Sequence, residues 1–377
     1  MINYSKQSIN SKEIIAVTNV LKSNYLTQGP LVQKFEKRIK NYCKSKYTVA
    51  VNSATSGLHI ACMSLGIKKK DIVWTSAISF VASANAAAYC GANIEFLDIS
   101  LNDYNINISN LKTKLFKAKQ KGKLPKVIIV VHFAGNPCQM DEIYKLKKKY
   151  KFKIIEDSSH ALGAKYKNNI IGNCKYSDMC IFSFHPVKSI TTAEGGAVTT
   201  NVKKYYDDLK LFREHGIKRE FKKKKIRPKY YEQIKLGYNY RMNELEAALG
   251  IEQIKKLNHF INKRIKIFRI YKAKLKNDLF IYPNISINSK SSHHLFVILL
   301  KKNSKIFRDK IFLKLLKKGV GVNIHYMPIY KHPFYQKRNY SLVNSEKYYN
   351  TCISIPIFPS LSKNQQNFVI RTINSIK

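Results

Sequence analysis

The sequence has no apolar run of the length that a membrane-spanning helix needs. Such a helix takes about 18 or more consecutive apolar residues, and the longest mainly apolar stretch, Ser76–Leu97, is interrupted by Ser, Asn and Gly. The first residues, Met1–Lys6, contain no apolar core of the kind found in an export signal. We therefore expect a cytoplasmic protein without a membrane partner.

Cysteines at metal-binding spacing are also missing. The seven cysteines form no C-x-x-C pair and their number is odd, whereas zinc sites and disulfide frameworks show regular spacing or even counts. A chain of 377 residues also buries a core large enough to fold without such cross-links. We expect reduced, mostly buried thiols and no metal site.

Acidic residues are scarce: 23 Asp and Glu stand against 68 Lys and Arg, which gives a net charge of +45. A charge of this size attracts polyanions such as nucleic acid. Only ten of the 68 basic residues are arginine, however, and the lysines are spread along the whole chain, whereas nucleic-acid-binding proteins gather basic residues on one face. A codon bias toward Lys, Ile and Asn explains the charge more simply, so we expect no nucleic-acid partner. The charge would still favour an anionic small substrate.

What the sequence does contain is an alternation of strand-like and helix-like segments over its first 200 residues. The β-branched run Val127–Phe133 predicts a strand covered on both faces, and the charged segment Met140–Tyr150 predicts a helix. This rhythm indicates an α/β fold with a mostly parallel sheet. Further strands are predicted at Tyr47–Val51, Ile72–Thr75, Ile94–Leu97, Lys153–Glu156, Met179–Phe184 and Gly196–Thr200, and further helices at Gly57–Leu65 and Phe80–Tyr89.

The second half of the chain has a different pattern. The basic, aromatic stretch Lys218–Tyr231 predicts a loop. The apolar periodicity from Asn243 to about Lys276 predicts helix, long enough to be a kinked connector between domains. We expect a large domain over residues 1–250 and a small α+β domain over residues 251–377. The small domain is indicated by a strand, a helix and a strand at His294–Leu300, Ile306–Lys318 and Val320–Ile324.

Four segments carry polar side chains where a parallel sheet binds its ligands, at the carboxyl ends of strands. The first, Asn52–Gly57, follows a strand and opens a helix, so its amides and hydroxyls would bind a phosphate or simply cap the helix. The second, Ile154–His160, runs from an apolar strand into the acidic pair Glu156 and Asp157. A carboxylate there would bind a metal, orient a histidine, pair with a protonated ring nitrogen or cap the next turn.

The third segment holds Lys188 between an aromatic strand and the Gly195-Gly196 turn, and the run Ser189–Ala197 adds no further basic residue. Most lysines of such a chain are solvated, but an amine held among apolar neighbours has a lowered pKa and acts as a nucleophile. The fourth segment, Gly237–Glu244, is a turn before the long helix, which a plain loop capped by Asn243 would also explain.

Together these segments fit pyridoxal phosphate. This cofactor needs a phosphate cradle, an amine for its aldehyde, an acid beside its ring nitrogen and a flat group over its ring. Lys188 would supply the amine, Asp157 the acid and Phe80 the flat group. The cradle would consist of Ala54, Thr55, Ser56 and Ser183.

Five strings of this sequence carry a resemblance to a known family. They are LTQGP at Leu26–Pro30, NSATSGLH at Asn52–His59, EDSSHALGA at Glu156–Ala164, SFHPVKSITTAEGGAVTTN at Ser183–Asn201 and GYNYRMNELEAALG at Gly237–Gly250. The chain resembles the sugar aminotransferases of the DegT/DnrJ/EryC1/StrS family. The resemblance implies an α/β fold, the fold type I of pyridoxal-phosphate-dependent transferases (aspartate aminotransferase-like), with a large mixed-sheet domain and a small α+β C-terminal domain.

The resemblance also implies a role for each matched residue. Lys188 would hold the cofactor and move a proton to and from the substrate carbon, and Asp157 would pair with the pyridine nitrogen. Asn239 would reach the phosphate from the partner subunit, so that a homodimer shares its active sites. His160 and Phe80 would lie at the ring, and the phosphate would contact Thr55, Ser56 and Ser183. The segments expected to bind the sugar nucleotide contain Tyr4, Asn24, Tyr25, Leu26, Thr27, Ala54, Ser183, Asn239, His325, Tyr326, Met327 and Pro328.

Within the family, the strings SSHALG, SFHPVKSITTAEGG, LFREHG and HYMPIY are most similar to those of enzymes of pseudaminic acid biosynthesis. This similarity implies that the protein transfers an amino group from L-glutamate to C4 of a UDP-linked 4-keto-6-deoxy-N-acetylhexosamine. The L-glutamate leaves as 2-oxoglutarate. Another nucleotide-linked keto sugar is an alternative substrate.

Dehydratases on this scaffold carry His at the lysine position, and a non-catalytic relative would have lost Lys188 or Asp157. Ser189 stands where proline is expected, which leaves the lysine in place.

Overall fold

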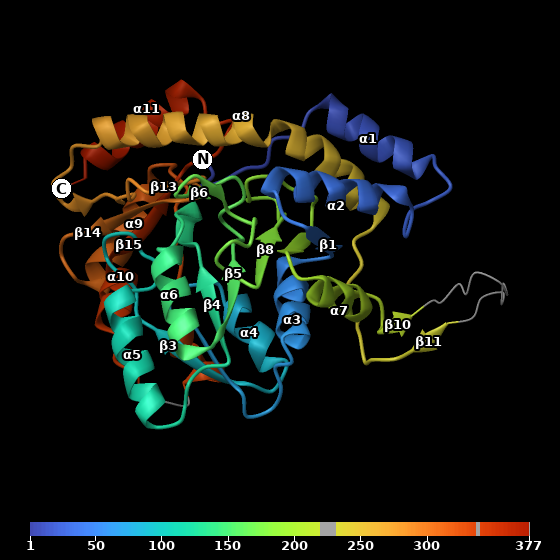
Figure 1. Ribbon diagram of the computed structural model, residues 1–377. Helices are drawn as coiled ribbons and strands as arrows, with labels where there is room; N and C mark the ends of the chain where they lie inside the picture. Colours follow the sequence, from blue (N-terminus) through green and yellow to red (C-terminus); the bar gives the residue numbers. More distant parts are fainter. Residues whose placement is uncertain (219–230, 337–339, 377) are drawn as a thin grey trace.

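A seven-stranded sheet forms the centre of the molecule (Figure 1) in the computed structural model, which describes residues 1–218, 231–336 and 340–376. Its strands lie in the order β1-β9-β8-β5-β4-β2-β3. Their bounds are β1 Tyr47–Val51, β2 Ile72–Ser76, β3 Asn93–Leu97, β4 Val127–Val131, β5 Lys153–Asp157, β8 Met179–Ser183 and β9 Gly196–Thr200.

The sheet is mostly parallel, as the sequence predicts, and contains one reversed strand. The five strands from β8 to β3 run parallel to their neighbours, whereas β9 is antiparallel to both β8 and β1. The strand β9 is reversed because residues 184–195 lead the chain directly back beside β8, without a crossover helix. Ser183 at the end of β8 is therefore paired with Gly196, and the segment that holds Lys188 protrudes at the carboxyl edge of the sheet.

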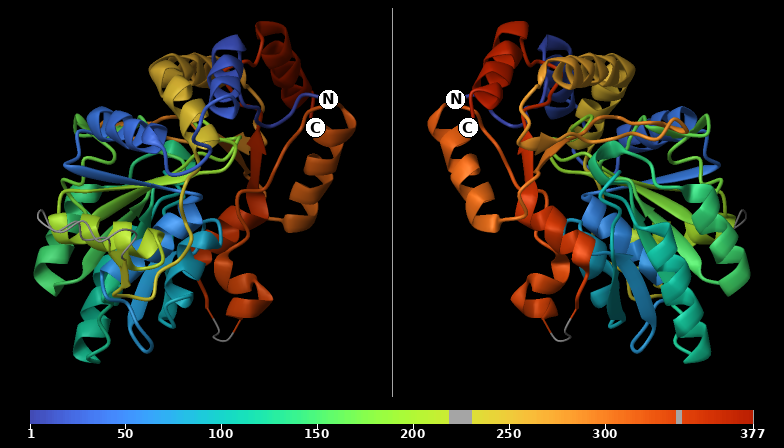
Figure 2. Two further views of the ribbon diagram at one scale, coloured as in Figure 1. Left: turned by 90° about the vertical axis from the view of Figure 1, so that its right-hand side faces the viewer. Right: turned by 90° about the vertical axis from the view of Figure 1, so that its left-hand side faces the viewer.

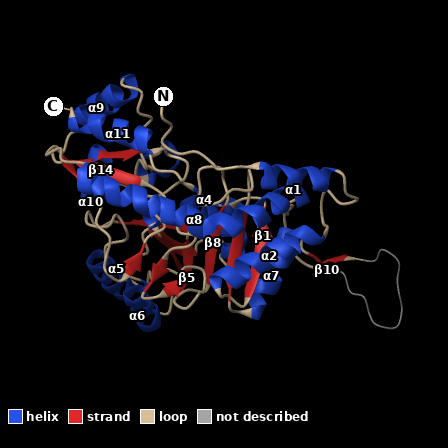
Figure 3. Ribbon diagram, turned by 90° about the horizontal axis from the view of Figure 1, so that it is seen from above, coloured by secondary structure: helices blue, strands red, loops and turns tan. Residues whose placement is uncertain are grey.

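Helices cover both faces of the sheet (Figures 1 and 3). Alternate residues of β4 point to opposite faces, so Ile128 belongs to one core cluster and Ile129 to the other. On the first face lie α2 Pro30–Cys43, α5 Ile108–Gln120, α6 Met140–Tyr150 and the first half of α8, and on the second α3 Ala54–Ser64, α4 Ala82–Ala88 and α7 Lys203–Arg213. Helix α1 (Ser11–Leu21) packs against α8.

The helix α8 (Glu244–Lys274) connects the sheet to the C-terminal elements as one uninterrupted helix. The predicted helical segment is confirmed, and it forms one helix that connects the two parts of the chain. Leu257, in its first half, belongs to the core cluster of the sheet, whereas Ile267 and Tyr271 belong to a separate cluster of C-terminal residues. The division at residue 250 falls inside this helix and stays a prediction.

The C-terminal part contains a small antiparallel sheet covered by helices. Its strands are β12 Phe280–Ile281, β14 Phe296–Leu300 and β15 Cys352–Ile355, and its helices are α9 Lys305–Lys317, α10 Val343–Thr351 and α11 Lys363–Asn374. The strand predicted at Val320–Ile324 is wrong. The backbone of Gly321 donates to Ile2 in the N-terminal segment, and Val320 and Asn323 form isolated bridges with Ile2 and Ser354. Figure 2 shows both termini beside these helices.

Several short strands complete the described chain: β6 Lys165–Tyr166, β7 Asn169–Ile170, β10 Ile217–Lys218, β11 Glu232–Gln233 and β13 Ser289–Lys290. Most of the loop predicted at Lys218–Tyr231 lies outside the described residues. The seven cysteines are unpaired, and all except Cys90 are buried. Among the described helices, none is both long and apolar enough to cross a membrane.

Candidate active site

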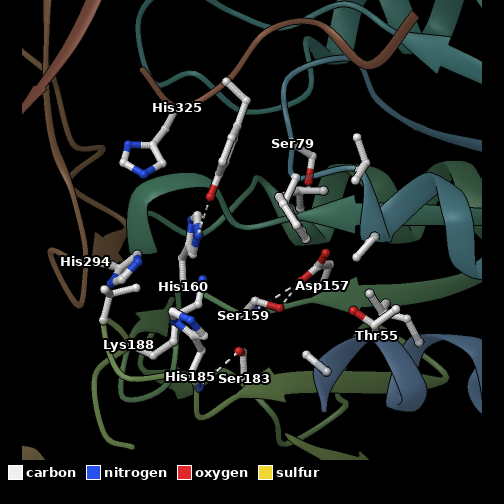
Figure 4. Close-up of a pocket in the computed structure, with 18 of the residues that line it drawn as sticks. Thr55, Ser79, Asp157, Ser159, His160, Ser183, His185, Lys188, His294 and His325 are labelled. Atoms are coloured by element: carbon white, nitrogen blue, oxygen red, sulfur yellow. Dashed lines mark hydrogen bonds between the residues drawn. The ribbon is translucent and has the colours of Figure 1, made fainter. Parts of the chain in front are cut away.

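A cavity of about 730 Å³ opens at the carboxyl ends of the parallel strands and is closed on one side by C-terminal residues (Figure 4). Its size suits a small-molecule site. It brings together most of the residues that the sequence predicts for the site. These are Tyr4, Ala54, Thr55, Phe80, Asp157, His160, Ser183, Lys188, His325, Tyr326 and Met327.

The other predicted residues lie outside the lining of this cavity. Ser56 is buried, and its amide donates to Ser53 Oγ at 3.1 Å. Asn239 lies in the segment that precedes α8 and forms an isolated antiparallel β-bridge with Glu214. Asn24, Tyr25, Leu26 and Thr27 are exposed between α1 and α2, and Pro328 precedes a short 3-10 turn. Their roles stay predictions, and that of Asn239 concerns the partner subunit's site.

Lys188 is half-buried in the turn after β8, where its amide donates to the carbonyl of His185 at 2.9 Å. Among the described side chains, none forms a hydrogen bond with its Nζ. Burial lowers the pKa of Lys188 to about 8, although the charge of Asp157 acts in the opposite direction. A large fraction of this amine is therefore neutral at mildly alkaline pH, as a nucleophilic lysine requires.

Asp157 ends β5 and directs its carboxylate into the same cavity. Its Oδ2 accepts a hydrogen bond from Ser83 Oγ at 2.6 Å, and its Oδ1 accepts from the amide and hydroxyl of Ser159 at 3.1 and 2.6 Å. All three donors are neutral, so none of them occupies the carboxylate with an opposite charge, and it can face a cationic partner such as a protonated ring nitrogen. Ser83 was not predicted. Ser159 follows Asp157 by two residues, the spacing of an Asx turn, and this signal could have identified it.

The start of α3 reaches the same cavity as Lys188, and two of its amides are not used by the helix cap. Ser53 caps the helix by accepting from the amide of Ser56. The amides of Ala54 and Thr55 form no hydrogen bond with another described residue. A Cβ atom on Gly196 would lie 2.6 Å from the nitrogen of Ala54, so only glycine lets β9 approach this closely. Helix capping and anion binding are thus compatible here, because different amides serve each.

Three buried histidines and a tyrosine form the wall beside Lys188 (Figure 4). Nε2 of His160 lies 3.3 Å from the hydroxyl of Tyr326, and the rings of His160 and His294 are 4.4 Å apart. Burial, together with the charge of Lys188, lowers the pKa of His160 well below its ordinary value and that of His325 to about 3. These imidazoles are therefore neutral at neutral pH.

Sequence reasoning missed several residues that line the cavity: Ser79, His185, Glu194 and His294. His294 entered the prediction only as the first residue of a strand. Its place in the cavity depends on how the segment before β14 packs against the large sheet, and no local pattern reveals such packing.

The side chains around the cavity fit pyridoxal phosphate. Lys188 offers a free amine with a lowered pKa, Asp157 offers a fixed carboxylate, and the amides of Ala54 and Thr55 are available for a phosphate. Phe80 is 57% exposed and lines the cavity, so one face of its ring is available for contact. This donor set matches the requirements of the cofactor group by group.

Comparisons with known proteins lead to the same chemistry. Residues 7–374 match the model of the DegT/DnrJ/EryC1/StrS aminotransferase family. A UDP-4-amino-4,6-dideoxy-N-acetyl-beta-L-altrosamine transaminase of Campylobacter jejuni is 42% identical over 379 residues, which cover 100% of this chain and 97% of that protein.

Two solved structures are similar over nearly their whole length. PseC of Helicobacter pylori, an aminotransferase involved in the biosynthesis of pseudoaminic acid, has a TM-score of 0.90 and 32% identity, covering 99% of this chain and 98% of that one. The PLP form of the putative sugar aminotransferase Spr1654 of Streptococcus pneumoniae has a TM-score of 0.89 and 26% identity, with the same coverage of 99% and 98%. The chain described here belongs to the DegT/DnrJ/EryC1/StrS family and is a pyridoxal-phosphate-dependent sugar aminotransferase of fold type I.

Proposed function

We propose that the protein transfers the amino group of L-glutamate to C4 of a UDP-linked 4-keto-6-deoxy-N-acetylhexosamine in pseudaminic acid biosynthesis. The observation that carries the proposal is a cavity with Lys188 and Asp157 in a chain 42% identical to the Campylobacter jejuni transaminase. The name of that relative describes a sugar with an amino group at C4 and no hydroxyl at C6. The matching acceptor is the 4-keto-6-deoxy sugar.

The residues of this chain divide the work of binding and proton transfer. The amides of Ala54 and Thr55, with the hydroxyls of Thr55 and Ser183, would hold the phosphate of the cofactor. When bound, pyridoxal phosphate supplies an electron sink for the charge left on the carbon next to the transferred nitrogen. Asp157 would keep the proton on the ring nitrogen, and Lys188 would bind the aldehyde carbon, then accept and return the substrate proton at Nζ.

The acceptor would occupy the part of the cavity next to the C-terminal wall. Tyr4 lies against His325 with ring centroids 5.4 Å apart, and Tyr326 and Met327 extend the same wall. The imidazole of His325 is held by Ser354 Oγ at 2.8 Å, so this wall is fixed before a substrate enters. The positive charge of the chain favours approach of the diphosphate.

We further propose a cytoplasmic homodimer with shared active sites. Asn24–Thr27 and Asn239 lie outside the cavity of their own subunit and would complete the cavity of the partner. Apolar side chains near these segments support this assignment, since Tyr25, Leu26 and Leu236 are 58%, 51% and 76% exposed. A second copy would cover such a surface.

Amino transfer from labelled glutamate tests the proposal. The protein loaded with pyridoxal phosphate is incubated with L-glutamate carrying a heavy nitrogen isotope and with UDP-4-keto-6-deoxy-N-acetylhexosamines, and the sugar product is identified by mass spectrometry. We expect the label at C4 of the sugar. Labelling of a different nucleotide-linked keto sugar only would assign the alternative acceptor. No labelled product from any keto sugar would overturn the proposal.

A further inference from the structure

The amino donor of the proposed reaction carries a carboxylate next to the nitrogen that it gives up, and this group has no obvious partner. A carboxylate is usually held by arginine or lysine. None of the described residues that line the cavity is arginine, and Lys188 is the one lysine among them. Because Lys188 is assigned to the proton transfer, the remaining polar side chains of this described lining are the candidates for binding the donor carboxylate.

The three buried histidines of the wall beside Lys188 differ in how many of their ring nitrogens have a hydrogen-bond partner. Nδ1 of His325 lies 2.8 Å from Ser354 Oγ, and its Nε2 lies 3.4 Å from Nδ2 of Asn323. By contrast, Nδ1 of His160 and Nδ1 of His294 are buried without a hydrogen-bond partner among the described residues. Unpartnered buried nitrogens are unfavourable unless a ligand or a proton makes use of them. His160 and His294 are therefore the members of the wall with unused hydrogen-bonding capacity.

This histidine pair, His160 and His294, is held in place from outside the cavity. Ser292 Oγ donates to the carbonyl of His160 at 2.7 Å, and the amide of His294 donates to the carbonyl of Ala134 at 3.0 Å. Arg264 in α8 donates to the carbonyl of His294 at 3.1 Å. A Cβ on Gly135 would lie 2.8 Å from the carbonyl of His160, which shows how closely these segments pack. The two rings are thus fixed against each other beside Lys188.

We propose that the histidine pair binds the donor carboxylate by taking up a proton from solvent as the anion enters. The same pair is neutral while the uncharged ring of the sugar occupies this part of the cavity. One wall then serves an anionic donor and a neutral acceptor in turn. The proposal rests on the proposed function, which makes both substrates visit one cavity.

The surroundings of the pair favour protonation only when an anion is present. The titratable and charged groups around it are Lys188, His325, Tyr326 and Arg264. Burial lowers the pKa of both imidazoles well below the ordinary value, and the positive charge of Lys188 lowers it further. A carboxylate within hydrogen-bonding distance acts in the opposite direction, because an opposite charge stabilises the protonated ring. Proton uptake should therefore accompany carboxylate binding.

Calorimetry with glutarate measures this proton directly. Glutarate has the two carboxylates of the donor and no amino or keto group, so its binding to the cofactor-loaded protein involves no chemistry. Titrations at one pH in buffers of different ionisation enthalpy give the number of protons taken up per bound glutarate. We expect net proton uptake in the wild type and a clear decrease of this uptake in His294→Asn. In steady-state kinetics, we expect the same variant to have a KM for L-glutamate that is raised roughly tenfold or more, with little change in the KM for the sugar.

His293 provides the matched control. It is the preceding residue and is also buried, but its ring packs on Phe268 in α8, 4.1 Å away, and it does not line the cavity. We expect His293→Asn to keep the wild-type proton uptake. Glutarate that does not bind, or that binds the wild type without proton uptake, would overturn the proposal without any variant. Equal uptake in wild type and His294→Asn would overturn it too, whereas loss of amino transfer with uptake retained would contradict the proposed function instead.

Discussion

The hydroxyl of Ser83 donates to Oδ2 of Asp157 at 2.6 Å and joins α4 to the end of β5. This contact orients the carboxylate that would face the cofactor ring, while Ser159 holds the other oxygen. We expect Ser83→Ala to lower kcat for amino transfer roughly tenfold, because one strong hydrogen bond to a charged group is lost. Steady-state kinetics with the cofactor content measured in parallel tests this. Ser64→Ala is the control, since that buried serine donates to the carbonyl of Ile60 within α3. Equal losses in both variants would refute the role of Ser83.

The lowered pKa of Lys188 predicts how fast the cofactor-free protein captures pyridoxal phosphate. Only the neutral amine attacks an aldehyde, so the rate should rise with pH and level off above about 8, the pKa of Lys188. Stopped-flow absorption across this pH range provides the measurement. Lys188→Ala should show no covalent capture. A rate that continues to rise toward the ordinary lysine pKa of 10.5 would contradict the burial of the amine.

Glu244 connects two of the sequence motifs across the fold. Its buried carboxylate accepts from the amides of Leu31 and Val32 at 2.8 and 3.2 Å and so caps α2. We expect Glu244→Gln to lower the free energy of unfolding by about 3 kcal/mol, because a buried helix start loses its anionic acceptor. Urea unfolding at a fixed protein concentration measures the change. Glu246→Gln, in the capping box of α8, is the control and should cost about 1 kcal/mol or less.

Mixing two inactive variants tests the shared active site. If Asn239 acts in the partner's cavity, a heterodimer of Lys188→Ala and Asn239→Ala contains one site with both residues intact. Random mixing makes half of the dimers heterodimers, so about a quarter of the wild-type activity should return. Subunits are exchanged under mild denaturation and activity is assayed after refolding. If no activity returns although mixed dimers form, Asn239 acts within its own subunit.

Elements with a strong local pattern could be predicted closely from the sequence. The predicted bounds of Met140–Tyr150 and Gly196–Thr200 agree with α6 and β9, because periodicity and flanking turn residues are both local signals. Val320–Ile324 has an equally apolar pattern but is not a strand, since Ile2 from the other end of the chain takes its hydrogen bonds. Pairing between distant segments leaves no local signal.

The residues of the candidate site also fall into two groups: those that a local sequence pattern predicts and those that only tertiary packing brings to the cavity. Asp157 ends a strand of the sheet, and Thr55 and Lys188 follow two others, so a sequence that predicts the strands also brings these residues together. Ser83 and His294 reach the cavity through the packing of α4 over β5 and of the segment before β14 against Gly135. Their roles depend on tertiary contacts, and they could be recognised only in the structure.

The absorption spectrum of the purified protein, before and after addition of L-glutamate, tests the central assignment most directly. We expect a visible absorption band from pyridoxal phosphate joined to Lys188, which disappears when L-glutamate converts the cofactor to its amine form. Lys188→Ala should lack the wild-type band, and Lys165→Ala, an exposed lysine of β6, should keep it. A wild-type protein that shows no such band after incubation with pyridoxal phosphate, or a band that L-glutamate leaves unchanged, would contradict the assignment.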